Sequence, residues 1–474
     1  MATTRTGVER FQMGLRLWAL PMLLIASGPP IFRNQFRTSL ASIQGSVDFW
    51  VAYQGLIYAA AGAMSALLLL SGGVRGLPRR HLVLAALTAG VLLFCLASSL
   101  WSPSAMATFV MAALLVTAIF VTVQFSVSAS RSTLDPMALW SLLRVFSLAM
   151  AAMILAAYFA HIRGVATYNV YEGFRLRGGT VGVTGTVGMT IFTISLYRLA
   201  MVRPGHPIEA ALTAAGLGLI YITHTRAAYL VSVGVATLIW LLWVIRPEVR
   251  RKSGAVKLAA TLMIVPGIVL ILLVAGRGVE SLFLRNSGES FSNLSHRTTI
   301  WGWILDASFR QPMGYGFSTG FRYAFQNMNY IDKYAYREQG LVIGRIGESH
   351  NSYLEMLVGS GWLAFLMFIA ALTIVTVRCV RSTFRTPHRA ATRQPLEIGM
   401  VLLISMLLDA FTTSSYIRPT HQPLGYLLFT IGAMLALEAR QFSRGATASG
   451  PAAGSGGETE FLAQQVPGEA RVQH

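Results

Sequence analysis

Apolar stretches of about 20 residues recur from one end of this chain to the other, and an α-helix needs this length to cross a lipid bilayer. Hydrophobic residues make up 54% of the 474 residues, whereas charged residues make up only 12%. A soluble domain of average composition carries roughly a quarter charged residues. The sequence therefore predicts an all-α, polytopic integral membrane protein.

On this rule we expect about 12 transmembrane helices. They cover residues 15–31, 49–70, 82–100, 105–125, 139–160, 181–201, 208–223, 227–245, 255–275, 353–377, 396–411 and 423–437. Residues 1–445 are expected to form one transmembrane domain. Residues 446–474 are rich in Gly, Ala and Ser, a composition typical of a disordered tail.

The positive charge predicts the orientation of these helices. The formal net charge is +19 and comes almost entirely from arginine. In a soluble protein it would suggest nucleic acid, but cytoplasmic loops of membrane proteins also accumulate positive charge. The basic residues of the short loops lie on one side if the N-terminus is cytoplasmic: Arg75, Arg79, Arg80, Arg250, Arg251, Lys252, Arg378, Arg381, Arg385, Arg389 and Arg393. We therefore expect both termini in the cytoplasm and no nucleic-acid partner.

One outer segment, residues 276–350, is much longer than the other loops. It is too long for a plain connector, and its tryptophans and phenylalanines could pack on the membrane surface. We expect it to form a large periplasmic loop that contains short helices. Its arginines are not explained by the positive-inside rule, because the loop lies on the outer side.

Arg226 lies in a tight outer turn between two expected helices. The turn is so short that the guanidinium must sit at the membrane surface, beside the hydroxyls of Thr223 and Thr225. Arginine can snorkel to lipid headgroups from such a position. We favour phosphate binding, since the flanking hydroxyls could bind the same anion.

Arg297 precedes an amphipathic helix expected over residues 298–309, with Trp301, Ile304 and Leu305 on one face. A helix N-terminus offers free N–H groups and a favourable dipole to an anion. The alternative is an exposed arginine on an interfacial helix, which this segment taken alone favours.

Arg175 and Arg177 precede a glycine-rich segment that lacks the Gly-Lys-Ser/Thr of a P-loop. We give them a secondary role, and we expect Gly188 and its neighbours to serve helix packing.

His350 stands where a polar loop gives way to a long apolar run, in the segment Glu348-Ser-His-Asn-Ser-Tyr-Leu-Glu355. A histidine can transfer a proton near neutral pH. His350 precedes Tyr353 and Leu354 by three and four residues, which would place the three on one helical face. Glu348 or Glu355 could orient the imidazole. The alternative is a histidine that only caps a helix.

No His-x-x-x-His pair, Asp-x-Asp motif or cysteine cluster occurs on the outer side, so no metal and no cofactor are expected.

Three of these segments resemble the bacterial O-antigen ligase and O-antigen (polysaccharide) polymerase family. They are Thr225-Arg-Ala-Ala228, Arg297-Thr-Thr-Ile-Trp301 with Gln311-Pro-Met-Gly-Tyr-Gly316, and His350-Asn-Ser-Tyr-Leu-Glu355 with Gly359-Ser-Gly-Trp-Leu363. The resemblance implies a glycosyltransferase of the bacterial inner membrane, with its active site facing the periplasm. It would transfer a glycan from undecaprenyl or another polyprenyl diphosphate to lipid A core, as a ligase, or to a growing polysaccharide, as a polymerase.

The resemblance also implies residue roles. Arg226 and Arg297 would hold the donor diphosphate, and His350 would be the acceptor-side base of a metal-independent, inverting transfer. The family's asparagine downstream of the first arginine-glycine segment is missing between Gly178 and Gly188, which argues against a donor role for Arg175 and Arg177 and keeps them as secondary candidates.

Ligase and polymerase share this donor chemistry, and the motif order favours the ligase. A polysaccharide or lipid transporter or flippase is the alternative from another class. Transporters place polar sites near the bilayer midplane and often have matching halves. This chain concentrates its unusual groups at the outer surface, with Asp409 as the main charge inside an expected span.

Overall fold

The computed structural model describes residues 49–68, 82–132, 134–162, 180–223, 226–245, 297–327, 349–387, 390–419 and 421–448. Within these ranges every regular element is a helix and no strand occurs. The all-α fold is therefore confirmed for the described part of the chain.

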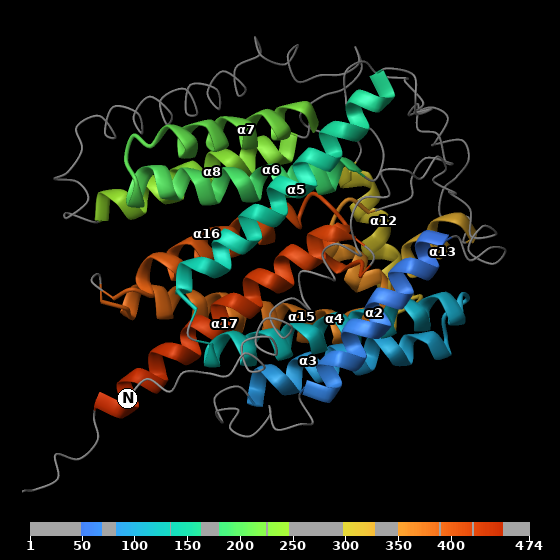
Figure 1. The fold of residues 1–474 in the computed structure, drawn as a ribbon. Coiled ribbons are helices and arrows are strands. Elements are labelled where there is room, and N and C mark those ends of the chain that lie inside the picture. The colour runs from blue at the N-terminus through green and yellow to red at the C-terminus, as the bar shows by residue number, and fades with distance from the viewer. Residues whose placement is uncertain are drawn as a thin grey trace, which may run out of the picture.

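The helices follow the expected apolar stretches (Figure 1). They are α2 (Phe49–Leu68), α3 (Leu82–Ala97), η4 (Ser98–Leu100), α4 (Ala105–Arg131), α5 (Pro136–Ile162), α6 (Thr180–Tyr197), η5 (Arg198–Val202), α7 (Pro207–Thr223), α8 (Arg226–Ile245), α12 (Arg297–Arg310), α13 (Gly320–Asn327), α15 (Ser352–Arg385), α16 (Arg393–Asp409), η8 (Ser415–Ile417) and α17 (Gln422–Ala448).

Seven of the described helices are long and apolar enough to cross a membrane. They comprise Leu82–Leu100, Ala105–Arg131, Pro136–Ala156, Thr184–Val202, Ala228–Ile245, Ser352–Arg385 and Gln422–Gln441. Two shorter apolar helices, Gly55–Leu68 and Pro207–Tyr221, also lie where spans are expected. The expected spans 15–31 and 255–275, and the tail from residue 449, lie outside the described residues.

The helices are arranged around α16 and α17. Figure 1 shows α6, α7 and α8 on one side of this pair and α3, α4 and α15 on the other. The aromatic rings of Phe125 and Phe429 lie 5.0 Å apart where α4 meets α17, and Trp140 of α5 meets Phe429 at 6.4 Å. Such ring pairs stabilise the packing of two helices beyond the contribution of the apolar area that they bury. The core therefore joins helices from the first and last thirds of the chain.

Glycines bring α6 and α7 into close contact. A Cβ on Gly216 of α7 would lie 2.7 Å from the backbone N of Phe192, and one on Gly188 would lie 3.0 Å from the backbone oxygen of Gly216. Small residues at such a crossing let two backbones approach each other. The expected packing role of Gly188 is confirmed.

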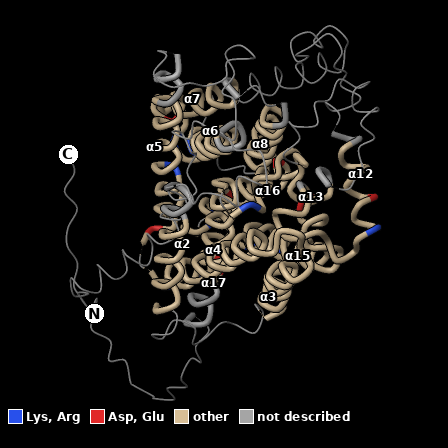
Figure 2. Tube along the Cα trace, turned by 90° about the vertical axis from the view of Figure 1, so that its right-hand side faces the viewer, with Lys and Arg blue, Asp and Glu red and all other residues tan. Residues whose placement is uncertain are grey.

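Charged residues are sparse along the described helices (Figure 2). Several arginines at the end expected to be cytoplasmic form partly or fully buried ion pairs. Glu209 pairs with Arg144 at 2.6 Å and Arg198 at 2.7 Å, Arg393 pairs with Glu397 at 2.6 Å, and Arg378 pairs with Glu438 at 2.8 Å. The Arg378–Glu438 pair joins α15 to α17, whereas the Arg393–Glu397 pair lies within α16. Arg393 reaches the end of α15 through a hydrogen bond to Thr386 O at 3.0 Å, so both arginines also hold helices together.

Candidate functional site

The polar turn before α15 is a helix cap. Asn351 has extended backbone angles, and its side-chain oxygen accepts the N–H groups of Tyr353 at 3.0 Å and Leu354 at 3.1 Å. An asparagine in this position satisfies N–H groups that have no partner inside the helix. The helix therefore begins at Ser352, one residue after the cap.

His350 lies on the loop side of that cap. Its φ is +52°, in the left-handed region that non-glycine residues rarely adopt. The side chain is exposed, whereas those of Ser349 and Asn351 on either side are buried. The hydroxyl of Ser349 donates to Asn351 O at 2.8 Å and accepts Asn351 N–H at 3.1 Å. The two neighbours bridge the turn and leave the imidazole on its outer side.

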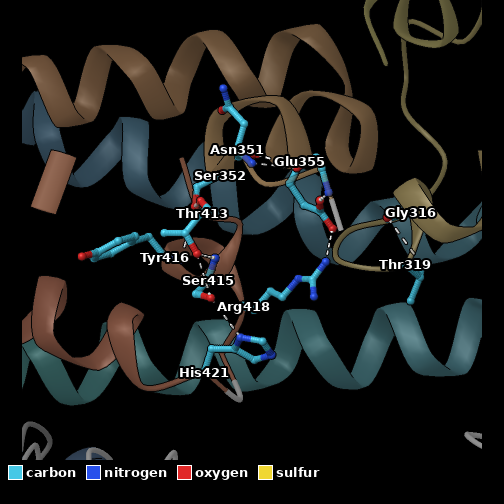
Figure 3. Close-up of polar contacts among 11 residues, drawn as sticks. Gly316, Thr319, Asn351, Ser352, Glu355, Thr413, Ser415, Tyr416, Arg418 and His421 are labelled. Atoms are coloured by element: carbon cyan, nitrogen blue, oxygen red, sulfur yellow. Dashed lines mark hydrogen bonds and ion pairs between the residues drawn. The ribbon is translucent and has the colours of Figure 1, made fainter. Parts of the chain in front are cut away.

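Glu355 forms the next layer beneath the turn. One carboxylate oxygen accepts the Ser349 backbone N–H at 3.2 Å, and the other pairs with Arg418 at 2.6 Å. Both side chains are buried, with 1% and 7% of their surfaces exposed. Figure 3 shows Arg418 reaching the carboxylate from the connection between α16 and α17.

The α16–α17 connection is also tied to the start of α15. Ser352 N–H donates to Ala410 O at 2.8 Å, and Ser352 Oγ donates to Thr413 O at 2.5 Å and accepts Tyr416 N–H at 3.2 Å. Ser352, Thr413 and Tyr416 lie close together in Figure 3. The segment 410–419 therefore packs against the turn of the candidate site.

The segment Gln311–Gly316 docks against a kink in α15. Gly361 has φ +82° and interrupts the helix. Tyr315 N–H donates to Val358 O at 2.9 Å, and Gly316 N–H donates to Gly359 O at 2.8 Å. A Cβ on Gly314 would lie 2.5 Å from Gly359 O. The two glycine-rich motifs, about 45 residues apart, therefore form a single backbone contact that needs glycine on both sides.

The α3–α4 connection holds the same segment from the other side. Trp101 Nε1 donates to Gly314 O at 3.1 Å, and Phe317 N–H donates to Ser98 Oγ at 3.0 Å. The hydroxyls of Thr108 and Thr319 lie 2.6 Å apart. The described part of the expected outer loop is thus bonded to the membrane helices at one end of the protein.

Comparison with known families identifies this region. Residues 211–369 match the family model described as O-antigen ligase. This segment is an O-antigen ligase domain. The resemblance drawn from the sequence motifs is confirmed, and with the apolar helices it indicates a membrane glycosyltransferase of the O-antigen ligase type. No curated protein matches the chain.

The O-antigen ligase domain contains Arg226, Arg297 and His350. Arg226 is the first residue of α8 and Arg297 the first residue of α12, and the structure describes their backbone but not their side chains. Arg175, Arg177 and Glu348 lie outside the described residues. Their expected roles remain predictions.

The structure corrects the expected helical face. His350, Tyr353 and Leu354 do not share one, because the helix begins only at Ser352 and His350 has a left-handed backbone. Tyr353 instead turns toward α16, where its hydroxyl donates to Leu407 O at 2.8 Å and its ring meets Phe411 at 4.5 Å. Tyr353 therefore packs against α16, and a secondary role for it in the site remains a prediction.

A second correction concerns α12. Its buried face is formed by Ile300, Ile304 and Ala307, whereas Leu305 is 38% exposed. Trp301 is half-buried, and its Nε1 donates to Ser349 O at 3.1 Å. The buried face is thus rotated by about one residue from the expected face. Trp301, at its edge, contacts the His350 turn.

Sequence reasoning missed Arg418. It lies outside the matched O-antigen ligase domain, in the short connection after α16. The available signal was its position, since an arginine in a short outer loop is not explained by the positive-inside rule. In the part of the chain that the structure describes, no three His, Cys, Asp or Glu side chains cluster as metal ligands would. The absence of a metal stays a prediction.

Proposed function

We propose that this protein transfers a polyprenyl-diphosphate-linked glycan to lipid A core at the periplasmic face, as an O-antigen ligase. The observation that carries the proposal is the O-antigen ligase match over residues 211–369, which contains Arg226, Arg297 and His350. Within this matched segment, His350 is exposed on the capped turn and supplies a side chain that can accept a proton.

His350 is proposed as the general base. The acceptor hydroxyl attacks the anomeric carbon, its proton passes to an imidazole nitrogen, and the bond from that carbon to the diphosphate oxygen breaks. Attack opposite the leaving group inverts the anomeric centre. Histidine suits this step because its ordinary pKa lies near the working pH. Ser349 and Asn351 are buried, so the imidazole is the group of this turn that is presented outward.

Arg226 and Arg297 are proposed to bind the donor diphosphate. Both begin helices, and helix N-termini favour anions. Arginine can bind a phosphate through two parallel hydrogen bonds. Positive charge at the diphosphate stabilises the negative charge that develops as the glycosidic bond breaks.

The proposed orientation places both termini in the cytoplasm and the site in the periplasm. The distribution of described residues supports it. The turn at His350, the segment 311–319 and the connection 410–419 are bonded together at one end. The ion pairs of Arg144 and Arg393 belong to helix ends that the topology assigns to the cytoplasm.

The test is transfer by purified protein in liposomes that contain lipid-diphosphate-linked glycan. We expect product when lipid A core is present, and loss of product in Arg226→Ala, Arg297→Ala and His350→Ala proteins that fold normally. A ladder of longer glycans without lipid A core would instead identify a polymerase. Transfer that survives all three substitutions would refute the assigned site, and a product that keeps the donor configuration would refute inversion.

A further inference from the structure

His350 holds a backbone conformation that its own residue type disfavours. Left-handed angles at a residue with a Cβ persist only where the surroundings fix them, and such residues are often found at functional sites. The peptide groups on both sides of His350 belong to Ser349 and Asn351, which are 0% and 4% exposed. What fixes these two neighbours therefore fixes the backbone from which the imidazole projects.

The backbone of Ser349 is bound on two sides by residues from different helices. Its N–H donates to Glu355 at 3.2 Å, and its carbonyl accepts the indole N–H of Trp301 at 3.1 Å. Glu355 belongs to α15 and Trp301 to α12. The turn cannot rotate as a unit without breaking one of these bonds.

Glu355 is itself oriented by Arg418. The arginine occupies one carboxylate oxygen at 2.6 Å, which directs the other oxygen toward Ser349. Arg418 in turn is fixed by its own connection, where its carbonyl accepts His421 N–H at 2.9 Å and Pro419 O accepts the hydroxyl of Tyr58 from α2. The ion pair therefore links the His350 turn to α2 and α17.

A buried ion pair is a poor means of gaining stability, because desolvation offsets much of the attraction and an apolar pair of similar size often does as well. Arg418 is also too buried, at 7% side-chain exposure, to serve as a primary contact for a lipid diphosphate. Fixing the direction of a hydrogen bond is a role that an apolar pair could not perform.

We propose that Arg418 and Glu355 are positioning residues that hold His350 through the backbone of Ser349. This inference rests on the proposed function, because it assigns the pair a role in transfer through the proposed base. It places a residue from outside the O-antigen ligase match in the support of the reacting group.

Paired substitutions test the proposal without leaving a buried charge alone. Glu355→Leu with Arg418→Met removes both charges and the acceptor of Ser349 N–H, whereas Glu355→Gln with Arg418→Met keeps an acceptor. Arg418→Lys alone keeps the charge beside Glu355 and should retain most of the transfer. The matched control is Glu438→Leu with Arg378→Met, which removes an ion pair of similar length, 2.8 Å, at the other end of the protein.

The first readout is the turnover number and the KM for the lipid-linked donor. We expect the Leu/Met pair to lower the turnover number roughly tenfold, as for residues coupled in one network, with little change in KM. The turnover number of the Glu355→Gln/Arg418→Met protein should lie between that of the Leu/Met pair and that of the control pair. The control pair should have the turnover number of the unaltered protein. Equal losses in the control pair and the Leu/Met pair would overturn the proposal.

The second readout needs no transfer. A His350→Cys protein is labelled with a membrane-impermeant maleimide, with and without the Leu/Met pair; the native Cys95 and Cys379 are buried. We expect the labelling rate at position 350 to shift by more than about twofold with the pair, the lower end of coupling within one network. An unchanged rate would overturn the positioning role. A shifted rate together with full transfer by His350→Ala would support positioning and refute His350 as the base.

Discussion

The backbone of Gly361 lies against Pro312, whose carbonyl accepts the N–H of Trp362 at 3.0 Å. A Cβ on Gly361 would overlap this carbonyl oxygen and lie 2.6 Å from the carbonyl carbon of Met313. The kink that Gly361 makes in α15 therefore gives the loop segment 311–316 its docking place. The part of α15 before the kink carries the His350 turn, and the part after it continues as the membrane helix.

Gly361→Ala should destabilise the protein, because it adds a Cβ to a backbone with φ +82° and against Pro312. We expect a loss of about 1–3 kcal/mol from the backbone conformation alone. The measurement is the midpoint of thermal unfolding in detergent. Gly218→Ala in α7, where a Cβ would meet nothing within 4 Å, is the control and should not lower the midpoint. Equal midpoints for the two variants would contradict the assigned role of the kink.

Asn351→Ala should weaken the start of α15. The substitution removes the acceptor of two N–H groups, which costs about 1 kcal/mol at a helix N-cap. Asn351→Asp keeps the acceptor and adds a charge that the helix dipole favours, so it should retain stability. Hydrogen exchange of the Tyr353 and Leu354 amides reports the difference directly. Exchange in Asn351→Ala as slow as in the unaltered protein would show that the cap does not depend on the side-chain oxygen.

Glu209→Gln should destabilise the other end of the protein. The carboxylate is 2% exposed and balances Arg144 and Arg198, and removing one partner of a buried ion pair costs about 3–5 kcal/mol. The two arginines are 17% and 12% exposed, so solvent screening should place the loss at the lower end of that range. Yield and unfolding midpoint should fall, while transfer per folded molecule stays constant. Reduced transfer at unchanged stability would place Glu209 in the reaction instead.

Tyr416→Phe should destabilise the α16–α17 connection by about 1–2 kcal/mol, because the phenol donates to Asp409 at 3.1 Å. Burial, and then the charge of Asp409, raise the pKa of Tyr416 well above its ordinary value. The neutral phenol is therefore favoured in the folded state, and its deprotonation can affect stability only above the unfolded pKa of about 10. Denaturation at pH 6 and pH 9 should give the same difference between the two proteins. A difference that shrinks by pH 9 would indicate that the phenol ionises in the folded state.

Much of this fold could be predicted from local sequence. The apolar stretches predict helices such as Leu82–Ala97 and Ala105–Arg131, because a bilayer-spanning helix needs little beyond length and hydrophobicity. The motifs around Arg226, Arg297 and His350 also indicated the O-antigen ligase domain before any contact was known. The predicted buried face of α12 was wrong because the neighbouring helices, and not the helix's own sequence, decide which of its sides is buried.

The sequence by itself thus determined the described helical elements, their order along the chain and the family of the domain, since each depends on short stretches of residues. Only the tertiary structure decided what surrounds His350. The spacing along the sequence would allow Glu355 to orient the imidazole directly. In the structure its carboxylate instead binds the backbone N–H of Ser349 and the side chain of Arg418, which lies 63 positions away. Side chains so far apart in sequence meet only through the packing of α15 against the α16–α17 connection, and a buried carboxylate binds the cation and the N–H group that this packing brings to it.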